Sequence, residues 1–142
     1  MRRILATAAI AIVPTFAAAQ DVVSYDLDGT FDDATFGVEN AIVNRGLVVD
    51  HVSQVGEMLN RTQADVGGED IFAQAAVYLF CSAVVSRQVM EADPDNIAFC
   101  PYGVFVAERD GQVRVGYRTY PDGPMDAVES LLDEIAREAA GQ

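Results

Sequence analysis

The stretch from residue 73 to residue 121 contains both cysteines of the chain and constrains its fold most strongly. Cys81 closes an apolar run, 75–80, whose length and aromatic content predict a buried strand. Cys100 follows residues 97–99, which we expect to begin another strand. Because strand starts commonly lie beside strand ends in a small sheet, we expect the two sulfurs to lie within bonding distance.

A short helix is predicted directly after Cys81. Ser82 is a typical N-cap residue, and residues 83–92 place three apolar side chains on one helical face. These side chains are Val85, Val89 and Ala92. Cys81 would then lie one residue outside a helix N-terminus, where unpaired amides favour an anion. It is therefore a candidate attacking thiol, with Cys100 as its resolving partner.

Residues 1–19 have the layout of a secretory signal peptide. Two arginines precede an apolar segment over 4–13, and small residues occupy 17–19. The apolar segment is shorter than the ~20 residues that a membrane-spanning helix needs. We expect cleavage after Ala19, which leaves one exported α/β domain over 20–142, either periplasmic or secreted.

The predicted mature chain is strongly acidic. It contains seven arginines, no lysine and 22 acidic residues, which give a net charge of −15. Such an excess repels phosphate backbones and anionic lipid head groups, so this composition disfavours nucleic-acid and membrane-surface binding. We interpret the acidity as a solvated, soluble surface.

Residues 22–28 are predicted to form the first strand, which ends in the motif Asp26-Leu27-Asp28-Gly29-Thr30. The motif resembles the nucleophile segment of haloacid-dehalogenase-like phosphatases, in which the first aspartate attacks phosphate. That chemistry needs a larger sheet and a basic residue, usually lysine, which the chain lacks. The favoured interpretation is that Thr30 caps a helix whose first turn carries acidic residues.

A helix is predicted from Phe31 to the stop at Gly46, with one core-facing stripe. The stripe consists of Phe31, Ala34, Val38, Ala41 and Ile42. The opposite face carries Phe36 and Val43, where a solvated helix would carry charges. We therefore predict that Phe36 and Val43 contact a second subunit or another partner.

Residues 47–55 alternate and predict a strand with the chain's only histidine, His51, on the same face as Val49. Met58 lies in a short predicted helix, 57–64. A histidine and a methionine would suit copper, but a lone histidine is more often a hydrogen-bonded structural residue.

The second half contains a clear hairpin signal. Asp110-Gly111 joins predicted strands over 103–108 and 112–120, because both turn residues tolerate positive φ. This register places Val104 and Val106 on the buried face, opposite Tyr117 and Val115, and places Arg114 and Arg118 on the other face. A helix follows Pro124, with an apolar stripe formed by Met125, Val128, Leu132, Ile135 and Ala139.

The element order is therefore strand, helix, strand, short helix, strand, helix, hairpin and helix. It predicts an α+β two-layer sandwich with helices on one face of a mainly antiparallel sheet.

The chain also resembles the bacterial domain of unknown function 302 family. The matching segments are residues 30–33, residues 45–47, Cys81 before a helix, and Cys100 before an apolar hairpin. The family typically has Cys-Asn-Pro and Pro-Cys-Asn at these cysteines, whereas this chain has Cys-Ser-Ala and Phe-Cys-Pro. The resemblance implies a TATA-binding-protein-like topology, often a homodimer, and no established activity.

These residues are compatible with three functions. The leading hypothesis is a non-catalytic exported binding or accessory domain, with no cofactor and a structural Cys81–Cys100 disulfide. Its partner would be a protein or a small molecule. The second is thiol redox or sulfur-transfer chemistry at the same two cysteines. The third is a metal or haem site using a cysteine, His51 or a methionine, although no ligand pair has the close spacing of dedicated sites.

Overall fold

The computed structural model describes residues 21–142, so the predicted signal peptide lies outside the described residues. One antiparallel sheet has the strand order β1-β5-β4-β3-β2. The strands are β1 (Val22–Leu27), β2 (Val49–Ser53), β3 (Gln74–Phe80), β4 (Tyr102–Arg109) and β5 (Gln112–Arg118). The predicted α+β class and antiparallel sheet are confirmed.

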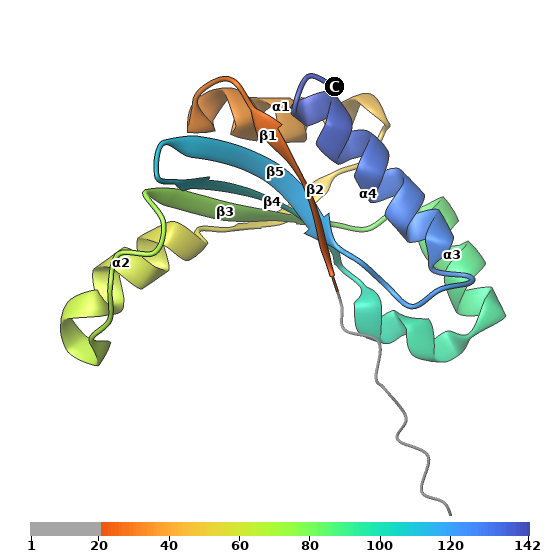
Figure 1. Cartoon of the computed structure of the whole chain (residues 1–142). Coiled ribbons are helices and arrows are strands. Elements are labelled where there is room, and N and C mark those ends of the chain that lie inside the picture. The colour runs from red at the N-terminus through yellow and green to blue at the C-terminus, as the bar shows by residue number, and fades with distance from the viewer. Residues whose placement is uncertain (1–20) are drawn as a thin grey trace, which may run out of the picture.

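Four α-helices and one 3₁₀ helix accompany the sheet within residues 21–142. They are α1 (Phe31–Asn44), α2 (Val55–Val66), α3 (Ala83–Ala92), the 3₁₀ helix η1 (Pro94–Phe99) and α4 (Asp126–Ala139). Figure 1 shows α1 and α4 lying together over one face of the sheet, with α2 and α3 toward its two ends. The predicted order of helices and strands is confirmed. None of the helices described here has the length and apolar character needed to cross a membrane.

The core lies between the sheet and the pair α1 and α4. The apolar stripe predicted for α4 is buried along its whole length, and α1 buries four of its five predicted core residues fully. Phe31, at the start of α1, is half-buried against the same core. Alternate residues of β3, β4 and β5 point into this layer, because side-chain direction reverses at each step along a strand.

The β4–β5 hairpin has the predicted turn and register. Arg109 pairs with Gln112 across Asp110 and Gly111, and both turn residues have positive φ, at 54° and 77°. Val106 pairs with Val115, and both are fully buried on the helix side of the sheet.

The prediction of a strand start at residues 97–99 is wrong. These residues belong to η1, and β4 begins three residues later, at Tyr102. The Asp93 side chain accepts a hydrogen bond from the Asp95 amide, and Pro94 occupies the first turn, which favours a helical start. The buried Asn96 amide then donates to the Val89 carbonyl at 2.9 Å and fixes η1 against α3.

The end of α3 also differs from the prediction. Val89 is buried and Val85 is half-buried, but Ala92 is exposed because the helix ends there and Asp93 is already extended.

The predicted strict alternation in residues 47–55 is also wrong. β2 is shorter than predicted, and its pairing with β3 shifts between Val49 and His51. Such a bulge reverses the face on which the following residues lie. As a result Val49 and Val52 both pack against the core, while His51 is exposed.

Among the described residues, no helix lies across the centre of the second face of the sheet (Figure 1). We call this surface the open face and define it by Val77, Leu79, Gly103, Phe105, Gly116 and Arg118. These residues alternate along β3, β4 and β5 with those that point into the core. The first turn of α2 packs on the start of β3, where a Cβ at Gly56 would lie only 2.6 Å from the Ala75 nitrogen.

Candidate functional site

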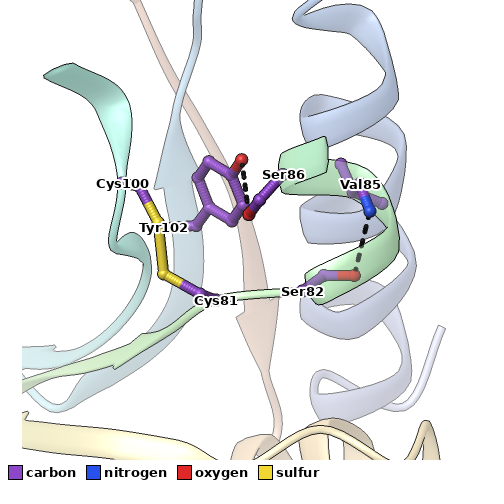
Figure 2. Close-up of a disulfide and its surroundings, with 6 residues drawn as sticks. All are labelled: Cys81, Ser82, Val85, Ser86, Cys100 and Tyr102. Carbon is purple, nitrogen blue, oxygen red and sulfur yellow. Dashed lines mark hydrogen bonds between the residues drawn. A yellow bond between two sulfur atoms is a disulfide. The ribbon is translucent and has the colours of Figure 1, made fainter. Parts of the chain in front are cut away.

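The two cysteines form a disulfide at the junction of β3 and β4. Phe80 and Tyr102, the paired ends of these strands, lie immediately inside the bond. The Cα atoms of Cys81 and Cys100 are 6.5 Å apart, within the range that a disulfide spans. Figure 2 shows the bond linking the end of β3 to the segment that leads into β4. The sequence predicted this pairing, although Cys100 follows a 3₁₀ helix rather than a strand start.

Helix α3 begins beside the disulfide as predicted. The Ser82 hydroxyl accepts a hydrogen bond from the Val85 amide at 3.3 Å, which makes Ser82 the N-cap. One turn later, the Ser86 hydroxyl lies 3.2 Å from that of the buried Tyr102 (Figure 2). Cys81 therefore lies directly before a capped helix that is fixed to β4.

A pocket of about 470 Å³ occupies the open face next to the disulfide. Its volume lies within the ~300–1,000 Å³ range of small-molecule sites. The lining residues come from β3, β4, β5, the end of η1 and the two residues that follow it. They are Val77, Leu79, Ala98, Phe99, Cys100, Pro101, Gly103, Phe105 and Arg118. The lining is therefore apolar apart from one arginine.

Two glycines shape the floor of this pocket. At Gly116 a Cβ would lie 2.6 Å from the Phe105 ring and 2.4 Å from the Val23 carbonyl oxygen. The Phe105 ring therefore occupies the space left by the missing side chain of its cross-strand partner. Gly103 lies beside Val77 and Leu79 and contributes only backbone to the pocket.

Arg118 supplies the positive charge of the pocket. Its guanidinium carbon lies 5.0 Å from the ring centroid of Tyr120 and 6.0 Å from that of Phe99. The two rings meet edge to face, with centroids 5.6 Å apart. This aromatic support favours a cation and holds the arginine at the margin of the pocket.

The comparisons with known proteins agree with this fold. A family model described as "Domain of unknown function DUF302" matches residues 23–142. The chain belongs to this family. A crystal structure of an uncharacterized conserved DUF302 protein from Bacillus stearothermophilus is similar, with a TM-score of 0.61 and 16% identity. The alignment covers 84% of this chain and 93% of that chain. No functionally curated protein matches the sequence. The predicted family is confirmed.

The other sequence candidates lie apart from the pocket of this DUF302 domain. His51 and Met58 are exposed on β2 and α2, and neither lines the pocket. In residues 21–142, no group of three or more histidine, cysteine or acidic side chains is arranged to hold a metal ion.

Thr30, the last residue of the phosphatase-like motif 26–30, has a structural role. Thr30 forms a capping box with Asp33: its hydroxyl accepts from the Asp33 amide, and its own amide donates to the Asp33 carboxylate. Asp26 forms an ion pair with Arg114 at 3.3 Å.

Phe36 and Val43 lie on the outer surface of α1. Their exposed fractions are 69% and 54%, so the predicted apolar pair is accessible to a partner. It lies in the helical layer, across the sheet from the open face (Figure 1).

A polar network joins β1, β5 and α4. The hydroxyls of Tyr25 and Tyr117 both donate to one oxygen of Asp133, Tyr117 at 2.9 Å. Arg137 donates to the other oxygen at 2.7 Å. Burial, followed by the bond to Asp133, raises the pKa of Tyr117. Burial acts to raise the pKa of Asp133, but the bonds from Tyr25, Arg137 and Tyr117 outweigh it and lower that pKa.

The pocket and Arg118 are the features that sequence reasoning did not find. The hairpin register correctly placed Arg118 away from the core. A sequence pattern does not show whether a sheet face is flat or contains a pocket. Two glycines in the predicted strands, Gly103 and Gly116, were the available signal, since such glycines often mark a close approach of other groups.

Proposed function

We propose that this chain is an exported, non-catalytic binding or accessory domain whose binding surface is the open face. The observation that carries the proposal is the apolar pocket of about 470 Å³ on that face, next to the disulfide. The other face of the sheet forms the core with α1 and α4. The apolar side chains around the pocket point away from this core, so a ligand can reach them. An accessible apolar surface with one charged group is typical of recognition sites.

In this proposal the disulfide is structural. It ties the segment that forms one wall of the pocket, which includes Phe99 and Pro101, to the end of β3. Closing a loop between residues 81 and 100 stabilises the fold by about 3 kcal/mol in the chain-entropy model. An oxidising compartment, which the predicted signal peptide implies, would keep this bond formed.

Thiol redox or sulfur-transfer chemistry is the second candidate, and one contact favours it. Cys100 lines the pocket, so a molecule bound there would lie beside the disulfide. Cys81 precedes the capped start of α3, where a thiolate would be favoured. A measured reduction potential distinguishes the two: a value below about −300 mV supports the structural bond, and one between about −120 and −270 mV supports redox chemistry.

We also propose that Phe36 and Val43 form a contact with a second subunit or another partner. Sedimentation velocity of the wild type and of a Phe36→Ser, Val43→Ser variant tests for self-association. A dimer that dissociates in this variant, but not in Val84→Ser, supports the proposal. Val84, on α3, is an apolar residue that is more exposed than either Phe36 or Val43. If the wild type stays monomeric at high concentration, the contact is not with a second subunit.

The main proposal is tested with N-phenyl-1-naphthylamine, a neutral apolar dye that fluoresces when it leaves water. We expect saturable binding to the wild type and loss of binding in Ala98→Trp, which places a large ring at the pocket margin. Val84→Trp is the matched control and should bind as the wild type does. Equal binding to both variants would contradict a site on the open face.

The export part has its own test. The protein recovered from the exported fraction of its host should begin at Gln20. An intact N-terminus on protein retained in the cytoplasm would contradict export.

A further inference from the structure

We infer that the pocket on the open face binds amphipathic carboxylates, with the apolar body on the sheet and the carboxylate on Arg118. This inference rests on the proposed binding function and names the class of ligand. It is carried by the position and pairing of Arg118 and by the apolar floor beside it.

The pairing of Arg118 differs from that of its neighbours on the same face. Arg114 bonds to Asp26 and donates to the Ser24 hydroxyl at 2.6 Å, and Arg109 forms an ion pair with Asp110. Within residues 21–142, no carboxylate oxygen lies within 4 Å of the Arg118 guanidinium. In a chain with 22 acidic residues, this arginine therefore keeps its donors available for an external anion.

The aromatic support orients these donors. A guanidinium that packs on the rings of Tyr120 and Phe99 keeps its N–H groups free at its edge. That edge matches the two oxygens of a carboxylate in a bidentate pair. Phe99 also lines the pocket, so one side chain contacts both the cation and the apolar cavity.

Apart from Arg118, the side chains that line the pocket are apolar. Val77, Leu79, Pro101 and Phe105 present hydrocarbon, and Gly103 opens the space between them. A sugar or nucleotide would leave its hydroxyl groups unpaired there, which costs free energy. A hydrocarbon chain or ring gains from burial on the same surface. A ligand with one anionic head group and one apolar body therefore matches both parts of the pocket, Arg118 and the apolar floor.

The test compares decanoate with decanol, which share an apolar chain and differ in the charge of the head group. Displacement of N-phenyl-1-naphthylamine at pH 7.5 and fixed salt gives both affinities. We expect decanoate to bind the wild type about tenfold more tightly than decanol, the size of effect expected for a charge-assisted hydrogen-bonded pair. Arg118→Gln should abolish this preference, and Arg118→Lys should keep only part of it.

Arg114→Gln is the matched control, since it removes the same charge from the same strand outside the pocket. It should keep the full preference. Equal affinities of wild type for the two probes, or an equal loss in Arg114→Gln, would overturn the carboxylate inference while dye binding still supported the binding function. Failure of the dye to bind at all would remove both proposals. Conversion of a wild-type dimer to a monomer by Ala98→Trp, without decanoate binding, would assign the face to a second copy of the chain.

Discussion

Phe105 and Gly116 are cross-strand partners, and the Phe105 ring lies 2.6 Å from the position that a Cβ on Gly116 would occupy. The missing side chain lets the ring lie across β5 and form part of the pocket floor. The same position is closed by backbone, because the Val23 carbonyl oxygen of β1 would lie 2.4 Å from the added atom. Gly116 is therefore needed both for the close pairing of β1 with β5 and for the position of the Phe105 ring in the pocket floor.

Gly116→Ala should therefore destabilise the protein strongly. Neither the Val23 carbonyl nor the paired strand can move without loss of β1–β5 hydrogen bonds, so we expect a loss of about 3 kcal/mol or more in the free energy of unfolding. Urea denaturation measures it. Gly103→Ala is the control, since its Cβ would meet the Leu79 and Val77 side chains at 3.3 Å and the nearest backbone atom, the Tyr78 carbonyl oxygen, only at 4.0 Å. Equal losses in the two variants would contradict the close packing described at Gly116.

Two buried tyrosines should respond in opposite ways to loss of the hydroxyl group. The Tyr117 hydroxyl donates to Asp133, so Tyr117→Phe should lower the free energy of unfolding by about 1 kcal/mol. The Tyr120 hydroxyl is buried with no hydrogen-bond partner among residues 21–142. Tyr120→Phe should therefore be neutral or stabilising, because it removes an unsatisfied polar atom and keeps the ring. Thermal unfolding of both variants compares them, and a larger loss in Tyr120→Phe would be inconsistent with this assignment.

The Asp133 network should make stability depend on acid. Hydrogen bonds lower the pKa of Asp133 in the folded state, so its contribution is present above the unfolded pKa of about 3.9. It is lost as the pH falls through the folded-state pKa. We expect the free energy of unfolding to fall less steeply below about pH 4 in Asp133→Asn than in the wild type. Asp122→Asn, in an exposed turn, should behave as the wild type; parallel curves for wild type and Asp133→Asn would show that the network does not contribute.

A structural disulfide predicts equal effects of its two cysteines. Cys81→Ser and Cys100→Ser should each lower the free energy of unfolding by about 3 kcal/mol, and the double variant should lose little more. Denaturation under oxidising conditions measures all three. A functional loss confined to Cys81→Ser, at an unchanged Tm, would instead favour thiol chemistry.

Much of the fold could be predicted because the relevant signals are local. The α4 stripe from Met125 to Ala139 has helical spacing, and Asp110-Gly111 selects its own turn type. The errors arose where tertiary contacts decide the backbone. The bond from Asn96 to the Val89 carbonyl favours η1 over a strand, and the bulge at β2 moves His51 to the exposed side.

The site was predictable only in part. Two cysteines in a predicted exported chain indicate a disulfide, and the structure contains that bond. The pocket depends on how β3, β4, β5 and the end of η1 lie side by side. Its charge depends on Arg118, near which no other part of residues 21–142 places a carboxylate. Neither property is encoded in the spacing of any single segment.

Binding at the open face is tested most directly by ¹H–¹⁵N NMR spectra recorded while decanoate is added. The account predicts that the backbone amides of Gly103, Phe105 and Arg118 shift with one common affinity, while those of Phe36 and Val43 on α1 do not move. Shifts confined to α1, or an unchanged Gly103 amide at saturating decanoate, would contradict it.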